Sequence, residues 1–170
     1  MTAKIDCRYK KLSVSRIQVK NLIASNTALY IFFYDKPNGS FNHLNNSIKW
    51  NPECGMQLKN DNVMSPAIGL AHEMGHATQL MEGIITRDMW ITEELHKKIE
   101  ADNLARFETP IATELGEFTR EKYGDAKSSY VMSNSTDWGA LISNPDRSWW
   151  EFWKPGKVYE SMNTWTPALK

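Results

Sequence analysis

Cysteine is scarce in this chain of 170 residues, and long apolar runs are absent. Its two cysteines, Cys7 and Cys54, are too few for a disulfide framework and lack the CxxC spacing of a cysteine zinc site. The longest apolar stretch, residues 28–34, falls well short of a membrane span, so we expect a buried strand there. Residues 1–11 also lack the apolar core and cleavage site of a secretory signal, so no classical signal peptide is expected.

An excess charge of either sign is absent as well, because 20 basic residues balance 20 acidic ones. No overall field therefore attracts nucleic acid or an anionic membrane, and we expect neither as a partner. Only the beginning of the chain is locally basic, and residues 1–25 are interpreted as a possible solvated arm. Its basic side chains are Lys4, Arg8, Lys10, Lys11, Arg16 and Lys20.

The remaining composition is that of an ordinary globular protein, with 41% apolar and 24% charged residues. No internal repeat or linker divides the chain, so we predict a single domain over residues 1–170. Residues 130–170 form a tryptophan-rich C-terminal extension. We expect its indoles to pack into the core rather than form a substrate platform. The expectation concerns Trp138, Trp149, Trp150 and Trp153.

Two strands are predicted before residue 60. Residues 27–34 are rich in aromatic and β-branched side chains and are followed by the turn-forming residues 35–39. Residues 47–50 alternate in polarity and stop at Asn51-Pro52. We expect these two strands to pair in an antiparallel sheet.

Helices are predicted after residue 65. Ser65 is a candidate N-cap with Pro66 in the first turn, and Gly83 is a candidate end of that helix. Thr92 is expected to cap a second helix through about residue 106, and residues 109–110 to open a third that stops at Gly124. The fold class is therefore α+β: a short antiparallel sheet or hairpin packed on the first of these helices and on further helices.

The first of these predicted helices contains the motif HExxH, formed by His72, Glu73 and His76. Residues four apart lie on one face of a helix, so both imidazoles can bind one Zn²⁺ at about 2.0–2.1 Å. Glu73 can then take a proton from a water on the metal rather than bind the metal itself. A random arrangement of this composition gives the motif about 0.006 times, so composition alone does not explain it.

A catalytic zinc of this kind has three protein ligands and leaves one position for water. No HxxGxxH follows His76, so the third ligand must be a carboxylate further along the chain. Glu100 is the first choice and Glu108 the alternative, with Glu93 and Glu94 behind them. His96, next to two lysines, is expected to be solvated.

The sequence between about residue 48 and residue 123 resembles the NleD-type bacterial effector metallopeptidases, which are HExxH zincins. The most specific similarity is residues 65–77, SPAIGLAHEMGHA. It is supported by IKWNP at residues 48–52 and, further along, by Glu100, Asn103, Glu108, residues 115–117, Arg120 and Tyr123. Glu108 is followed by Thr109-Pro110 where many relatives carry Asn.

The resemblance implies a small zincin in which Glu100 is the third ligand and Glu108 a supporting acid. It also implies that Arg120 and Tyr123 stabilise negative charge on the tetrahedral intermediate. The function implied is a zinc endopeptidase that cleaves protein substrates as a secreted effector or toxin in the target-cell cytoplasm, delivered by a specialised system. The alternative is a catalytically inactive binding module with the zincin fold.

Overall fold

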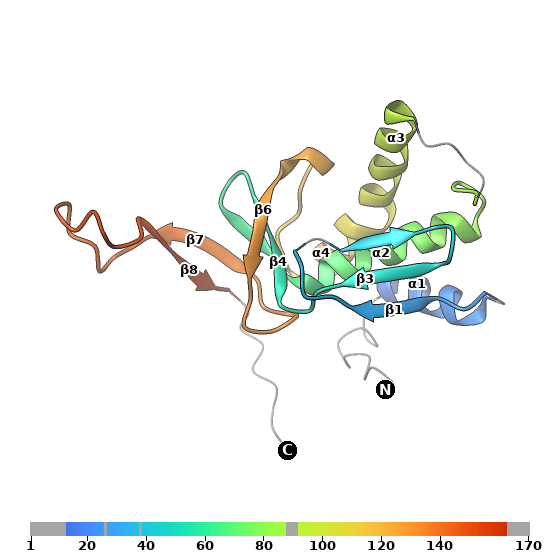
Figure 1. Cartoon of the computed structure of the whole chain (residues 1–170), viewed down its shortest axis with the longest axis horizontal. Helices are drawn as coiled ribbons and strands as arrows, with labels where there is room; N and C mark the ends of the chain where they lie inside the picture. The colour runs from blue at the N-terminus through green and yellow to red at the C-terminus, as the bar shows by residue number, and fades with distance from the viewer. Residues whose placement is uncertain (1–12, 26, 38, 88–91, 163–170) are drawn as a thin grey trace, which may run out of the picture.

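The computed structural model describes residues 13–25, 27–37, 39–87 and 92–162. Helices and two small sheets form a mixed α+β fold, as the sequence predicts (Figure 1). Within this part of the chain, no helix combines the length and the apolarity that crossing a bilayer requires. Most of the predicted basic arm, residues 1–12, lies outside the described residues, as does Cys7.

The first sheet consists of β1 (Tyr30–Phe33), β2 (Ser40–Asn42) and β3 (Ser47–Trp50), in the order β1-β3-β2. The expected antiparallel pairing of the two predicted strands is wrong, because β1 runs parallel to β3. The intervening residues form β2, which takes the antiparallel place beside β3. All four residues of β1 are exposed, so the expectation of a buried strand is also wrong.

The second sheet is antiparallel and has five strands in the order β6-β4-β5-β7-β8. β4 (Cys54–Leu58) and β5 (Asn62–Met64) are joined by a tight turn in which Asp61 has φ 65°. β6 (Ala126–Val131) forms one edge, and the hairpin of β7 (Gly139–Ser143) and β8 (Lys157–Ser161) forms the other.

Helix α2 (Pro66–Met81) carries the HExxH motif and begins at the residue after Ser65, as predicted. The Ser65 side chain, however, does not cap the helix. Its amide and hydroxyl instead donate hydrogen bonds to the buried carboxylate of Glu117, at 3.0 and 2.9 Å. The helix ends where expected, since Gly83 follows with φ 75°.

A second helical segment begins after Thr92, whose backbone is extended. Thr92 caps α3 (Glu93–Asn103) as predicted, because its hydroxyl accepts a hydrogen bond from the Leu95 amide at 3.2 Å. The π-helix η2 (Leu104–Glu108) connects α3 to α4 (Thr109–Leu115). The predicted stop at Gly124 is wrong: α4 ends at Gly116, which adopts the left-handed conformation with φ 74°.

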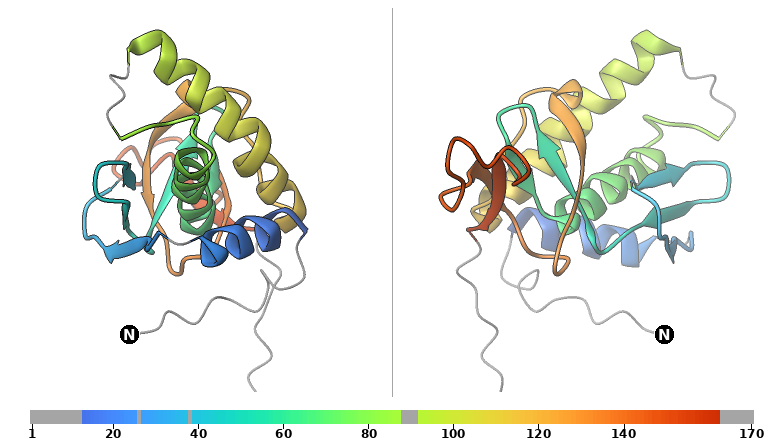
Figure 2. Two further views of the ribbon diagram at one scale, coloured as in Figure 1. Left: turned by 90° about the vertical axis from the view of Figure 1, so that its right-hand side faces the viewer. Right: turned by 60° about the vertical axis from the view of Figure 1, so that its left-hand side comes forward.

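The core lies between α2, α4 and the second sheet (Figure 2). Helix α1 (Ser13–Ala24) closes it from outside, and the buried amide of Gln18 donates to the Ala71 carbonyl of α2 at 3.3 Å. The buried residues of this core are Leu58, Met64, Ile68, Ala71, Ile111 and Ala112. The site helix α2 is therefore packed on several sides.

The tryptophan-rich extension does not pack as expected. Trp138 is half-buried against Phe118, with ring centroids 5.2 Å apart. Trp149, Trp150 and Trp153 are exposed on the loop between β7 and β8. Core packing is thus confirmed for the first indole only and is wrong for the other three.

Candidate metal centre

The two motif histidines lie one turn apart on the same face of α2, and both are buried. Their Nε2 atoms are 3.1 Å apart, and the rings are nearly perpendicular. Both Nε2 atoms are therefore close enough to bind the same ion, as the i, i+4 spacing predicts.

Glu100, on α3, brings its carboxylate to both histidines. Its Oε2 lies 3.2 Å from His72 Nε2, and its Oε1 lies 3.3 Å from His76 Nε2. A tetrahedral zinc ion with bonds of 2.0–2.1 Å holds its ligand atoms about 3.3–3.4 Å apart. The separations between His72, His76 and Glu100 are close to this value, and the group could hold a metal ion.

One observation supports a metal independently of these distances. Glu100 Oε2 is buried, and no described residue donates a hydrogen bond to it while both imidazoles are neutral and carry their protons on Nδ1. A buried carboxylate oxygen without a partner is costly. A cation bound between Glu100 and the two imidazoles would supply that partner, so these residues fit a metal.

The second nitrogen of each imidazole is engaged by another side chain. His72 Nδ1 is 2.8 Å from Glu108 Oε2, and His76 Nδ1 is 2.8 Å from Gln79 Oε1. The Gln79 amide nitrogen donates to the Ile99 carbonyl and to Asp102, which fixes its oxygen toward His76. Both Nδ1 atoms are therefore donors, and neutral imidazoles would present the Nε2 lone pairs to a metal.

Glu108 is itself held by Arg120, and both side chains are almost completely buried. Nε and Nη2 of Arg120 each donate to one carboxylate oxygen of Glu108 at 2.7 Å. Burial raises the pKa of Glu108, but the hydrogen bonds from His72 and Arg120 lower it more strongly, so the net shift is downward. Glu108 thus remains ionised as the partner of His72 Nδ1.

The two carboxylates also control the protonation of His72. Burial lowers the pKa of His72, but the hydrogen bonds to Glu100 and Glu108 outweigh it and raise the pKa to about 9. Burial raises the pKa of Glu100, but the two neighbouring histidines outweigh burial and lower this pKa to about 2. Without a metal, a proton therefore occupies the His72 nitrogen that ligation requires.

The π-helix η2 explains how Glu100 and Glu108 both reach His72. Eight residues span 2.2 turns of an α-helix, which would leave the two side chains about 80° apart around the axis. The wider turn of a π-helix takes up more residues and reduces this offset. The irregular segment therefore turns Glu108 toward the face that carries Glu100.

Close contact between α2 and α3 depends on Gly75. A Cβ atom at this position would overlap the side-chain oxygen of Asn103 and touch the ring of Phe107. The fully buried Asn103 amide donates to the His72 carbonyl at 2.9 Å. The glycine between the two histidines thus permits the helix approach that brings Glu100 to them.

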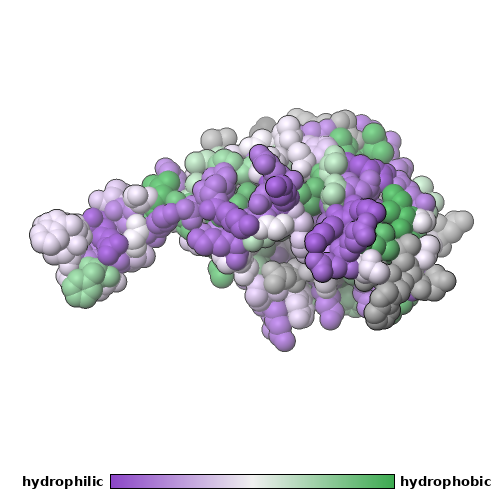
Figure 3. Space-filling model, turned by 90° about the horizontal axis from the view of Figure 1, so that it is seen from above, coloured by the Kyte–Doolittle hydropathy of each residue, from purple (hydrophilic) through white to green (hydrophobic). Residues whose placement is uncertain are grey.

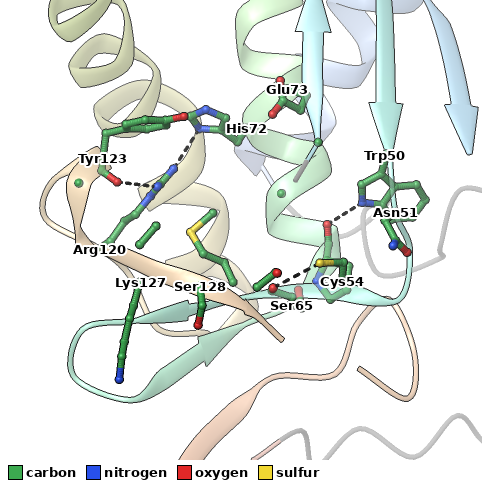
Figure 4. Close-up of a pocket in the computed structure, with 18 residues that line it drawn as sticks. Trp50, Asn51, Cys54, Ser65, His72, Glu73, Arg120, Tyr123, Lys127 and Ser128 are labelled. Atoms are coloured by element: carbon green, nitrogen blue, oxygen red, sulfur yellow. Dashed lines mark hydrogen bonds between the residues drawn. The ribbon is translucent and has the colours of Figure 1, made fainter. Parts of the chain in front are cut away.

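Glu73 and His72 both line a cleft beside the candidate metal centre (Figure 4). The side chain of Glu73 lies near the start of β2, where an added Cβ on Gly39 would be 3.3 Å from Glu73 Cγ. Burial raises the pKa of Glu73, and the two histidines only partly oppose this. A carboxylate with a raised pKa is better suited to exchange protons near neutral pH.

The cleft has a volume of about 580 Å³ and lies between the two sheets, with α2 along its floor. Trp50 of β3 forms one wall and is held by a 2.8 Å hydrogen bond from Nε1 to the Pro66 carbonyl. β4 and β6 form the opposite wall. Such a trough, open on one side, has room for an extended chain segment.

Tyr123 stands at the cleft beside the metal centre. Its half-exposed ring stacks on His72 at a centroid distance of 5.9 Å, and the Arg120 guanidinium lies 4.9 Å from the ring centroid. Arg120 also donates to the Tyr123 carbonyl at 3.0 Å. Burial raises the pKa of the phenol, so its proton is retained at neutral pH.

The other residues considered as metal ligands are Glu93, Glu94 and His96. Glu93 and Glu94 are exposed and pair with lysines one turn along α3. His96 is half-exposed, as expected, but its Nε2 reaches Glu100 Oε1 at 3.2 Å. Gln79 is not among the predicted site residues, although its place three residues after His76 puts it near His76 on the same helix.

Comparisons with known proteins add a family. No curated protein and no solved structure matches the chain. A family model described as peptidase M91, effector protein, matches residues 6–123, which is more than two thirds of the sequence. The match includes the whole cluster from His72 to Tyr123 and excludes the β7–β8 hairpin. The chain belongs to the peptidase M91 family of effector proteins.

Proposed function

We propose that this protein is a zinc-dependent endopeptidase that hydrolyses peptide bonds in a protein substrate. The observation that carries the proposal is the convergence of three buried ligand atoms at a cleft that Glu73 also lines. The peptidase family and its description as effector protein support the same function. We further infer that it acts as an effector or toxin in the cytoplasm of a target cell after delivery by a specialised system.

His72, His76 and Glu100 are the proposed ligands. Glu108 accepts the Nδ1 proton of His72 and keeps the ring oriented, and Gln79 does the same for His76. The choice of Glu100 over Glu108 rests on their different contacts. Glu100 approaches the Nε2 atoms of both rings, whereas Glu108 is already occupied by His72 Nδ1 and Arg120.

Zinc bound by these three residues would polarise the scissile carbonyl and lower the pKa of a water molecule. Glu73 accepts a proton from the attacking water and then gives it to the leaving amine nitrogen. Its raised pKa favours both transfers. The walls of the cleft hold an extended substrate segment across α2 while this happens.

Tyr123 and Arg120 complete the proposed catalytic set. The Tyr123 ring, stacked on His72, is near enough for its neutral hydroxyl to donate a hydrogen bond to a developing oxyanion. Arg120 supports this group in two ways, since it anchors Glu108 with two hydrogen bonds and fixes the backbone at Tyr123 with a third. Its positive charge also lies at the wall of the cleft.

The test is the replacement Glu73→Gln, which keeps the size of the side chain and removes the base. Purified protein is incubated with a peptide library prepared from a cell proteome, and new N-termini are identified by mass spectrometry. We expect cleavage to fall by about 10²–10⁴-fold while the zinc content stays near one per chain. Glu94→Gln, on the exposed face of α3, is the control and should cleave like the wild type.

Two results would contradict the proposal. Undiminished cleavage by the Glu73→Gln protein would exclude the proposed base. A wild-type protein that binds zinc but cuts nothing in libraries from several cell types would favour the inactive binding module instead.

A further inference from the structure

The β7–β8 hairpin ends in a group of exposed aromatic side chains, here called the aromatic tip: Trp149, Trp150, Phe152 and Trp153. Their exposed fractions are 89, 56, 81 and 65%. The hairpin projects from the body as an arm (Figure 1, Figure 3). Clustered exposed aromatic surface of this kind marks an interaction site.

The loop that carries the tip is ordered by its own polar groups. The Glu151 carboxylate accepts from the Ser148 amide at 2.9 Å and pairs with Lys154 at 2.8 Å, while the Arg147 side chain donates to the Glu151 carbonyl. At the base, the side-chain amide and backbone amide of Asn144 donate to the carbonyls of Pro155 and Gly156, just before β8. Polar groups thus bond within the loop, and the aromatic rings remain outside.

This arrangement suits entry into an apolar medium. A loop whose turns are closed by backbone hydrogen bonds and whose Glu151 and Lys154 are paired leaves fewer polar groups unsatisfied when water is removed. Glu151 is the only charged residue among residues 148–153, and Lys154 neutralises it. Lys157, at the base, is likewise paired with Asp61. The tip is therefore electrically neutral, which argues against a strongly charged partner.

The orientation of the rings favours a lipid bilayer over a rigid protein surface as the partner. Trp149 and Trp150 are nearly perpendicular at a centroid distance of 5.6 Å, and so are Phe152 and Trp153 at 5.4 Å. A flat protein surface cannot cover rings that face in several directions around a convex tip. The interfacial layer of a lipid bilayer can surround such a tip, and tryptophan is enriched at that depth.

We propose that the aromatic tip is a peripheral anchor that inserts into the interfacial layer of a zwitterionic lipid bilayer. This differs from the expectation of no membrane partner, which rested on the absence of a spanning segment and of net charge. The edge strand β6, which lines the cleft, and the opposite edge strand β8 of the hairpin are four strand spacings, about 19 Å, apart. Anchoring therefore leaves the cleft accessible to substrate.

The experiment is flotation of the full chain with phosphatidylcholine vesicles. The test variant replaces all four tip residues by serine: Trp149→Ser, Trp150→Ser, Phe152→Ser and Trp153→Ser. The matched control, Tyr30→Ser with Phe32→Ser, removes aromatic rings of comparable exposure from β1. We expect the tip variant to lower the vesicle partition coefficient at least about tenfold and the control to leave it unchanged.

A second measurement uses the wild-type protein alone, in case the tip variant folds poorly. Lipids brominated near the headgroup should quench tryptophan fluorescence, and added salt should have little effect because the tip is neutral. No flotation of the wild type at millimolar lipid, or equal flotation of the tip variant, overturns the proposal. So does a wild-type dimer that the tip variant converts to a monomer without vesicle binding, since the partner would then be a second copy. Neither readout depends on peptidase activity.

Discussion

At the scale of single residues, the centre is defined by which atom of each imidazole is already occupied. Glu108 and Gln79 engage the Nδ1 atoms of the two histidines, so the Nε2 atoms are left to face Glu100. Orienting partners of this kind affect metal affinity less than the ligands themselves. The two glutamates of the cluster should therefore differ in a measurable way.

We expect Glu100→Gln to lower zinc affinity by more than about 100-fold, and Glu108→Gln to lower it by about 10- to 100-fold. The first change removes a proposed ligand. The second leaves the ligands in place but weakens the hydrogen bond that orients His72 and removes the charge that pairs with Arg120. Competition with a chromogenic chelator measures both, and Glu94→Gln should match the wild type. If Glu108→Gln has the larger effect, the roles of the two acids are reversed.

The ion pair of Glu108 with Arg120 is buried, so removing one partner should cost more than removing both. Arg120→Met leaves the buried Glu108 carboxylate with His72 as its remaining partner, and we expect it to lower the free energy of unfolding by about 3 kcal/mol. The double variant Arg120→Met with Glu108→Gln should lose less. Urea unfolding of the metal-free proteins measures the difference, and strictly additive losses would show that the pair is not coupled.

At the scale of elements, the site depends on the close packing of α2 against the α3–η2 segment. Gly75 is the contact point, since the side chains of Asn103 and Phe107 occupy the space where a Cβ would lie. The π-helix then carries the chain from Glu100 to Glu108 with both acids facing α2. Neither feature changes the chemistry of the ligands, yet both determine whether the ligands meet.

Substituting Gly75 by alanine tests this packing. Alanine favours a helix over glycine by about 0.5–1 kcal/mol, whereas overpacking costs about 1–3 kcal/mol, so we expect net destabilisation and weaker zinc binding. Gly69→Ala is the matched control on the same helix, because nothing lies within 4 Å of its added Cβ. That control should be slightly stabilising in thermal unfolding. A stabilised Gly75→Ala protein with normal zinc affinity would contradict the packing argument.

Local signals in the sequence predicted local structure well. The span of α2, the Thr92 cap and the meeting of His72 with His76 follow from spacing and from capping chemistry. The predicted antiparallel pairing of β1 with β3 is wrong. The relative direction of two strands depends on the path of the chain between them, and here that chain forms β2. The third predicted helix is too long because its end is placed at Gly124 and not at Gly116. The π-helix has no period that the sequence could reveal.

At the scale of the whole molecule, the cleft is assembled from segments far apart in the sequence. Its floor comes from α2, its walls from β3, β4 and β6, and Tyr123 precedes the last of these. A metal bound at the junction of α2 and α3 would connect the helical segments that carry the proposed ligands. Its contribution should therefore appear in the stability of the whole fold.

Removing the metal should lower the melting temperature. An ion present at about 100 times its dissociation constant stabilises the folded state by about 2.7 kcal/mol, which corresponds to about 5–10 °C for a chain of this size. Thermal unfolding before and after dialysis against a chelator measures the shift, and adding zinc back should restore it. The Glu100→Gln protein should show a much smaller shift. An equal shift in that variant would place the stabilising metal elsewhere.

His72, His76 and Glu100 are proposed to bind one zinc ion together, and crystallography can locate that ion. Crystals of protein purified without chelator would be measured on both sides of the zinc absorption edge. We predict a single anomalous peak about 2.0–2.2 Å from both histidine Nε2 atoms and from a Glu100 oxygen. No peak at this position after soaking in zinc, or a peak coordinated by Glu108 in place of Glu100, would contradict the account.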